Sequence, residues 1–231
     1  MSQRSITLEI YEIKKEIDDY FSIYFKKPKN FVYHPGDCFD LIITKDTFKE
    51  KRIFSFSSSP TERLLQITYR KGISQYKKYL ENMTKGDTLE LLYFGNQYSF
   101  YYEKPLVFFA GGIGITVFKS ALQYAIDNKL QPSINLLFIN KTDRFPFMNI
   151  LDEYKKFLNL TIHYYQTSKE GRLTKDKLKE ILPSIMDIKY EYYIAGPPLM
   201  VDSTSDLLRK FGIDDKTIHT DSFDGYLEET R

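Results

Sequence analysis

The first hundred residues contain short runs of β-branched and aromatic residues that turn signals such as Pro35-Gly36-Asp37 and Lys85-Gly86-Asp87 separate. Six such runs at this spacing predict a small antiparallel barrel or sandwich. The expected strands are Ile6–Tyr11, Tyr20–Phe25, Cys38–Ile43, Ile53–Ser57, Leu64–Arg70 and Thr88–Phe94. One helical pattern, Ser74–Met83, interrupts them, with Ser74 as its expected N-cap.

After Lys104-Pro105 the sequence pattern changes, and predicted strands alternate with predicted helices. This alternation predicts a parallel sheet covered by helices. The expected strands are Leu106–Ala110, Ile134–Ile139, Leu160–Tyr165, Tyr192–Ala195 and Thr217–Asp221, and the expected helices are Thr116–Asn128, Met148–Phe157, Thr174–Leu182 and Pro198–Phe211. The chain is therefore expected to form two domains, a six-stranded antiparallel β-barrel over residues 1–103 and an α/β domain over residues 104–231.

Composition narrows the function classes. The 231 residues have a formal net charge of +2, which provides no strong field for nucleic acid or a membrane surface. Cys38 is the only cysteine, so one chain can form neither a disulfide nor a cysteine-ligated metal site, as is usual in a reducing compartment. The N-terminus has no signal-peptide pattern, and no apolar run is long enough to span a membrane. We expect a cytoplasmic monomer without a metal.

Two glycine turns follow predicted strands of the α/β half. Gly111, Gly112 and Gly114 separate the first strand from the next helix, and Gly196 precedes Pro197-Pro198 at a second strand–helix junction. Glycines at such a junction let backbone N–H groups approach a phosphate, but a tight turn alone would also require them. The dinucleotide fingerprint G-x-G-x-x-G is incomplete, because Val117 stands at its third glycine.

A third stretch, KRIFSFSSSP over Lys51–Pro60, lies in the β half. The planar guanidinium group of Arg52 can donate paired hydrogen bonds to a diphosphate. Phe54 provides the face of an aromatic ring, and Ser55 provides a hydroxyl group. If this stretch is considered alone, an edge strand with a solvated arginine and a core phenylalanine is the better interpretation.

Together, these three stretches resemble the ferredoxin–NADP reductase superfamily, particularly its compact bacterial NAD(P)H–flavin oxidoreductases. The family pattern R-x-[YF]-[ST] corresponds to Arg52–Ser55, G-G-x-G-[IV]-T-P to Gly111–Val117, and [CA]-G-P-P-x-M to Ala195–Met200. Weaker matches occur in family order at 33–39, 71–74, 171–174 and 223–226, so the resemblance covers nearly the whole chain.

The resemblance implies an FAD-binding barrel and an NAD(P)-binding α/β domain. It implies that Arg52 binds the FAD diphosphate, that Phe54 lies along the flavin, and that Ser55 acts near flavin N5, where the hydride arrives. The catalytic candidates are Ser55 and Thr116. The cofactor-binding candidates are Arg52, Ile53, Phe54, Ser55, Gly72, Ile73, Ser74, Gly111, Gly112, Gly114, Ile115, Thr116, Lys141, Arg144, Gly196, Pro197, Met200, Phe223 and Tyr226.

Three departures keep other functions open. Ala195 replaces the cysteine that many members place before G-P-P, Val117 replaces a proline, and Tyr98 replaces a glycine of G-P-x-G-x-F. The first interpretation is an FAD-dependent NAD(P)H oxidoreductase that passes electrons to an acceptor. One alternative is a free-flavin reductase, whose flavin would not survive desalting. The other is a non-catalytic reductase-like module, which would not oxidise NAD(P)H with an artificial acceptor.

The sequence gives weaker evidence about which coenzyme and which electron acceptor the protein uses. After the strand Ile134–Ile139 stands Asn140, where an acidic residue would favour NADH. Lys141 and Arg144 nearby suit the 2′-phosphate of NADPH, although Asp143 lies between them and a solvated loop is an equal alternative. Lysines 26, 27, 29, 77 and 78 could form a basic face for an acidic carrier such as flavodoxin or ferredoxin, although a solvated surface explains them more simply.

Overall fold

A computed structural model describes residues 5–223 with the exception of 46, 96–97 and 187–188. Contacts between residues divide the described chain into two compact units. The first contains residues 5–99 together with Thr116–Tyr124, and the second contains Phe100–Ile115 and residues 125–223.

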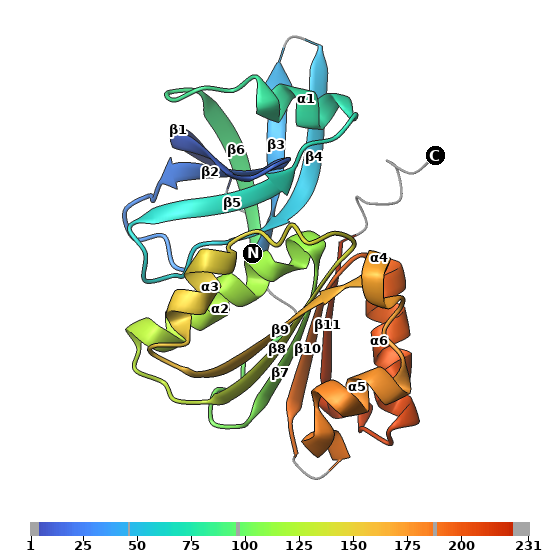
Figure 1. Ribbon diagram of the computed structural model, residues 1–231. Helices are drawn as coiled ribbons and strands as arrows, with labels where there is room; N and C mark the ends of the chain where they lie inside the picture. Colours follow the sequence, from blue (N-terminus) through green and yellow to red (C-terminus); the bar gives the residue numbers. More distant parts are fainter. Residues whose placement is uncertain (1–4, 46, 96–97, 187–188, 224–231) are drawn as a thin grey trace. The chain divides into compact units, whose positions relative to one another are not determined.

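The first unit is a six-stranded antiparallel sheet in the order β4-β3-β6-β1-β2-β5 (Figure 1). The strands are β1 Ser5–Ile17, β2 Tyr20–Lys26, β3 Cys38–Lys45, β4 Phe48–Ser55, β5 Leu64–Arg70 and β6 Thr88–Gly95. Irregularities in the pairing of β1 with β2 lie at Ile10/Glu12 and Lys15/Ile17. The first occurs where β1, which pairs with β6 over Ser5–Glu9, begins to pair with β2, and the second lies next to the turn between β1 and β2.

One apolar core fills this unit. Alternate side chains of five strands point into it, including Ile10, Phe25, Leu41, Ile67 and Leu91. The short helix α1, Gln75–Glu81, adds Tyr76 and Leu80. The side chain of Ser74 caps α1 by accepting a hydrogen bond from Lys77 N, as the sequence predicted.

The second unit is a five-stranded parallel sheet in the order β11-β10-β7-β8-β9. Its strands are β7 Leu106–Gly111, β8 Ser133–Asn140, β9 Asn159–Gln166, β10 Glu191–Gly196 and β11 Ile218–Ser222. Its helices are α3 Met148–Tyr154, α4 Thr167–Glu170, α5 Lys175–Ile181 and α6 Pro198–Lys210, while α2 Ile115–Asp127 has residues in both units.

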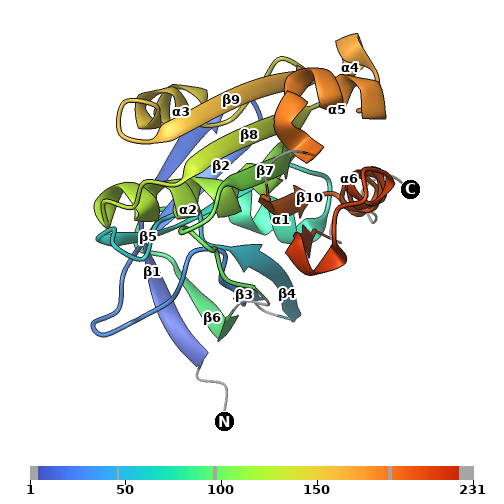
Figure 2. The ribbon, with the colours of Figure 1, turned by 90° about the horizontal axis from the view of Figure 1, so that it is seen from below.

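Two layers of helix cover this parallel sheet. Side chains of α5 and α6 pack on the face that presents Val107, Leu137 and Ile194, and α3 lies on the opposite face (Figures 1 and 2). β7 and β10 are buried along their whole length, which explains their nearly continuous apolar sequences.

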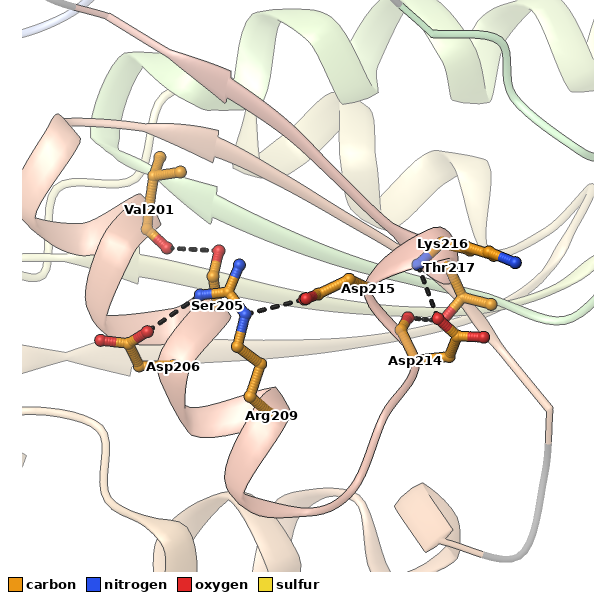
Figure 3. A network of polar contacts seen from close by, with 8 residues as sticks. All are labelled: Val201, Ser205, Asp206, Arg209, Asp214, Asp215, Lys216 and Thr217. Carbon is orange, nitrogen blue, oxygen red and sulfur yellow. Dashed lines mark hydrogen bonds and ion pairs between the residues drawn. The ribbon is translucent and has the colours of Figure 1, made fainter.

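A polar network fixes the approach to the edge strand β11 (Figure 3). Arg209 near the end of α6 donates from Nε to Asp215 at 2.7 Å and from Nη1 to Asp206 at 2.9 Å. Asp214 accepts a hydrogen bond from Lys216 N at 3.0 Å and starts the short turn that leads into β11. These contacts connect α6 to the segment that follows it.

The observed architecture confirms the predicted fold class, an antiparallel six-stranded β unit with a parallel α/β unit. The largest differences in strands are in β1, which ends at Ile17 rather than Tyr11, and in β4, which begins at Phe48 rather than Ile53. In β4 the charged residues 49–52 conceal a strand at one end of the sheet, where one face meets solvent. No helix in the described part of the chain is long and apolar enough to cross a membrane.

Candidate functional site

Two of the predicted flavin-binding segments come together in the first unit. The guanidinium carbon of Arg52 on β4 lies 5.8 Å from the ring centroid of Tyr76 on α1. The ring of Phe54 stacks on the same tyrosine, with 6.3 Å between the centroids. Tyr76 is itself held by its hydroxyl, which donates to Leu41 O at 2.7 Å. The segment Gly72–Ser74 leads directly into α1, so both segments approach one anchored ring.

Two isoleucines of these segments are exposed. Ile53 on β4 is 69% exposed and Ile73 before α1 is 71% exposed. Arg52 is available as a cation, although it also forms an ion pair with Glu50 on the same strand. The motif residues therefore supply apolar surface and positive charge that the core of this unit does not use.

Ser55 closes β4 and is buried, with 8% of its surface exposed. It pairs across the ladder with Cys38 of β3, whose thiol donates to Gly95 O at 3.1 Å. The backbone alternation places Arg52 and Phe54 on one face of β4 and Ile53 and Ser55 on the other.

The two glycine turns of the second unit meet at the carboxyl ends of neighbouring strands. A Cβ at Gly114 would lie 2.0 Å from Ala195 O, and a Cβ at Gly196 would lie 2.9 Å from Gly111 Cα. Gly196 also has a φ of +154°, which side chains rarely adopt. Gly112–Gly114 forms a single 3-10 turn from which α2 begins at Ile115. Backbone thus packs directly on backbone at this edge of the sheet.

Further predicted residues lie at the same edge. A Cβ at Gly111 would contact Pro197 Cδ at 2.9 Å and Met200 Sδ at 3.2 Å. Phe223 N donates to Gly196 O at 3.0 Å, which brings Phe223 beside the second turn. Thr116, one residue into α2, is buried and belongs to the first unit by its contacts. Tyr226 lies outside the described residues.

The loop after β8 presents Lys141 and Arg144 to solvent. Because Ile139 pairs with Gly111 in the parallel ladder, this loop leaves the same edge as the glycine turn. Arg144 N donates to Thr142 Oγ1 at 3.3 Å, and the Arg144 guanidinium lies 3.6 Å from the Asp143 carboxylate. The structure thus gathers the nucleotide-binding candidates of the second unit along one edge.

Residues 108–206 match the family model of the oxidoreductase NAD-binding domain. Along 95% of its length the chain superposes on ferredoxin–NADP+ reductase from Plasmodium falciparum, with a TM-score of 0.80, 18% identity and 96% of that chain covered. It also superposes, over 94% of its length, on the flavohem-like FAD/NAD-binding domain of nitric oxide dioxygenase from Vibrio cholerae, with a TM-score of 0.80, 20% identity and 98% of that chain covered. Residues 108–206 thus resemble an oxidoreductase NAD-binding domain, and the chain as a whole has the fold of the ferredoxin–NADP reductases.

One curated relative is a subunit of the 1,2-phenylacetyl-CoA epoxidase of Escherichia coli, which is 24% identical over 94% of this chain. The chain spans 46–67% of the length of the curated relatives that it matches. The other relatives include flavohemoproteins and the electron transfer component of a dioxygenase.

The superfamily resemblance did not single out one buried cation of α2. The helix is buried on all sides from Ile115 to Leu122, yet this stretch contains Lys119, which is only 4% exposed. Lys119 Nζ donates to Gln66 Oε1 at 2.9 Å and to Ser57 O at 3.1 Å, all within the first unit. Burial lowers the pKa of Lys119 below its usual value. A lysine inside an eight-residue buried helical stretch was the signal that could have identified it.

The lysines proposed as a basic face are partly engaged elsewhere. Lys26 forms an ion pair with Glu9 at 2.6 Å, and Lys27 donates to Pro60 O while lying over the ring of Tyr33. Among the described residues, no group of three or more His, Cys, Asp or Glu side chains is arranged to hold a metal ion.

Proposed function

We propose that the chain is an FAD-dependent NAD(P)H oxidoreductase that passes electrons on to an acceptor protein. The observation that carries this proposal is the meeting of Arg52 and Phe54 at the ring of Tyr76, two residues after the Gly72–Ser74 segment, with one exposed isoleucine in each of the two segments. Core packing gives no reason for this combination of cation and exposed apolar surface, whereas a large aromatic, anionic ligand would use both.

The residues of the first unit fit FAD. A flavin is apolar on its faces, which suits Phe54, and its diphosphate is anionic, which suits Arg52 on the same face of β4. The Ser74-capped start of α1 adds backbone N–H groups close to the same tyrosine. FAD, when bound, would supply the chemistry of accepting a hydride and releasing electrons singly.

The residues of the second unit fit a nicotinamide nucleotide. Glycines 111, 114 and 196 let the two turns pack together at the carboxyl edge of the sheet, which is where open parallel sheets bind ligands. We assign Gly111–Thr116 to the nucleotide phosphates and Gly196, Pro197 and Met200 to the nicotinamide. Phe223, beside Gly196, is the candidate aromatic cover.

Within this proposal the side chains orient the reactants and exclude water. Ser55 would donate its hydroxyl hydrogen near flavin N5, and its position is fixed because it ends a paired strand and is buried. Thr116 would hold the nucleotide at the start of α2. No general base would be required, because the bound cofactors would themselves supply the hydride chemistry and the side chains would only align them.

The proposed coenzyme is NADPH, because Lys141 and Arg144 are exposed at the edge where the adenosine ribose would lie. The proposed acceptor is an electron-carrier protein with an acidic surface, such as flavodoxin or ferredoxin. A relative named as an electron transfer component supports this partner class.

The decisive experiment is the visible spectrum of the purified protein after desalting, before and after NADPH or NADH under anaerobic conditions. We expect a bound yellow flavin that bleaches on addition of the nucleotide. Flavin lost on desalting, with turnover of added flavin, would instead indicate a free-flavin reductase. Retained flavin that neither nucleotide bleaches would indicate a non-catalytic module.

A further inference from the structure

A turn of three serines follows β4 directly after the proposed flavin motif. Ser57, Ser58 and Ser59 are completely buried, although they lie outside any strand. Their carbonyl oxygens therefore need hydrogen-bond donors other than those of the sheet. The turn begins only two residues after Ser55.

Two adjacent side chains of α2 supply donors to this turn. Lys119 Nζ donates to Ser57 O at 3.1 Å, and Ser120 Oγ donates to Ser58 O at 2.6 Å. From another direction, the Tyr33 hydroxyl donates to Ser59 O at 2.8 Å. Three consecutive carbonyls are thus held by side chains from elsewhere in the same unit.

A wholly buried polar network continues from Lys119. Its other acceptor, Gln66 Oε1, belongs to an amide whose Nε2 donates to Ser22 Oγ at 2.8 Å. Ser22 and Ser57 each share a hydrogen bond with Thr68 Oγ1, at 2.9 and 2.8 Å. The network therefore returns to the turn from which it began. Connected buried polar groups of this kind specify one geometry, because every displaced donor leaves a partner unsatisfied.

A lysine is a costly way to fill this space. Burying its amino group requires removal from water, and an apolar side chain of similar volume often replaces a buried charge without loss of stability. Both acceptors described above, a main-chain carbonyl and an amide oxygen, are neutral groups that an uncharged donor could also serve. Stability alone therefore gives little reason for a lysine at this position.

We propose that Lys119 is a positioning residue for the flavin site: by donating to Ser57 O and Gln66 Oε1 it fixes the turn after β4 and, through it, Ser55. This inference rests on the proposed function. It assigns a role in the flavin site to a residue of α2 that lies three positions after Thr116. Although Thr116 is proposed to hold the nucleotide, Lys119 acts on the turn that follows β4.

The test compares the parent with Lys119→Met, which keeps most of the volume and removes the donor. In flavin-free protein, we expect faster amide hydrogen exchange at residues 56–59. In the FAD-loaded enzyme, we expect the dissociation constant of FAD to rise about tenfold and the rate of flavin reduction to fall about tenfold or more, because small displacements strongly affect aligned transfer. The KM for the nucleotide should change by less than about twofold.

Two further variants make the result specific. Lys179→Met removes an exposed lysine of α5 and should leave all four quantities unchanged. Gln66→Met removes one acceptor of Lys119 and should change the same quantities in the same direction as Lys119→Met, but more weakly. If Lys119→Met fails to fold, Gln66→Met still tests whether the network positions the turn. Because both residues belong to one network, the double variant should be less impaired than the product of the single effects predicts.

A lower melting temperature with unchanged exchange at 56–59, FAD affinity and reduction rate would reduce Lys119 to a structural residue and overturn the inference. Full additivity of the two substitutions would also contradict it. A parent that binds no FAD would refute the proposed function instead, and the exchange measurement would still decide whether Lys119 fixes the turn.

Discussion

The glycine turns of the second unit and the Arg52–Ser55 segment of the first are both family motifs, but different constraints act on them. At Gly111, Gly114 and Gly196 the main chains of β7 and β10 approach so closely that no side chain fits. At Ile53 and Ile73 large apolar side chains face outward, where packing demands nothing of them. The fold alone therefore explains the glycines, whereas it makes no demand on the isoleucines, of which the proposed function assigns Ile53 and Ile73 to the flavin-binding segments.

This comparison teaches which motif is informative about binding. A residue that the fold already requires cannot also serve as evidence for a ligand. A residue placed against the usual rules of burial can, because its cost must be offset by something outside the core. The β4 segment accordingly supports the proposed function more strongly than the more familiar glycine pattern.

Gly114→Ala provides the largest expected effect. The added methyl group would lie 2.0 Å from Ala195 O, so the two strand ends must separate. We expect a loss of about 3 kcal/mol in the free energy of unfolding, measured by chemical denaturation. Gly212→Ala is the control, because Gly212 has a φ of +78° but nothing within 4 Å, and should cost only about 1 kcal/mol. Equal losses would mean that backbone strain, rather than close approach, explains the motif.

Arg52→Ala should separate binding from stability. We expect the dissociation constant of FAD to rise about tenfold to a hundredfold, because a charge-assisted contact to the diphosphate is lost. The free energy of unfolding of the flavin-free protein should barely change, since a partly exposed ion pair such as that of Arg52 with Glu50 contributes little. Lys49→Ala on the same strand is the matched control. Undiminished FAD affinity in Arg52→Ala would refute the assignment.

The double variant Lys141→Ala, Arg144→Ala tests the preference for NADPH over NADH. Both residues lie in an exposed loop, where packing does not constrain their identity. We expect kcat/KM for NADPH to fall about tenfold while that for NADH stays within about twofold, because only NADPH carries the additional phosphate. Steady-state kinetics with both nucleotides measure this. A parent that prefers NADH would already contradict the assignment.

The smallest expected effect concerns pH. Burial lowers the pKa of Lys119 from 10.5, so between the lowered value and 10.5 the unfolded chain binds more protons than the folded one. The unfolding free energy of the parent, relative to Lys119→Met, should therefore increase as the pH rises from the lowered pKa toward 10.5 and be lowest below the lowered pKa. Denaturation curves of both proteins from pH 7 to 10 measure the difference. A difference independent of pH would show that Lys119 titrates normally.

Local patterns predicted most of the fold. Three of the correctly predicted features depend on neighbouring residues alone. They are the capping serine before α1, the apolar runs of β7 and β10, and the change after Lys104 to alternating strands and helices. The prediction missed the beginning of β4 because an end strand with one solvated face can have a charged sequence.

The candidate site was less predictable because its geometry depends on distant pairs. Nothing near Arg52 in the sequence indicates Tyr76, and nothing near Ser57 indicates Lys119. Exposure also came only with the structure: Ile53 resembles any β-strand isoleucine until its surroundings are known.

The contacts from α2 to the serine turn have a consequence for sequence variation. Lys119 and Ser120 reach main-chain oxygens of Ser57 and Ser58, which every amino acid possesses. Substitutions in the turn can remove the hydroxyl contacts to Thr68 and Tyr33, but they leave those two acceptors in place. The main-chain acceptors should therefore tolerate changes in the sequence of the turn, whereas the donors on the helix depend on the identity of Lys119 and Ser120; burial still limits the turn to small side chains.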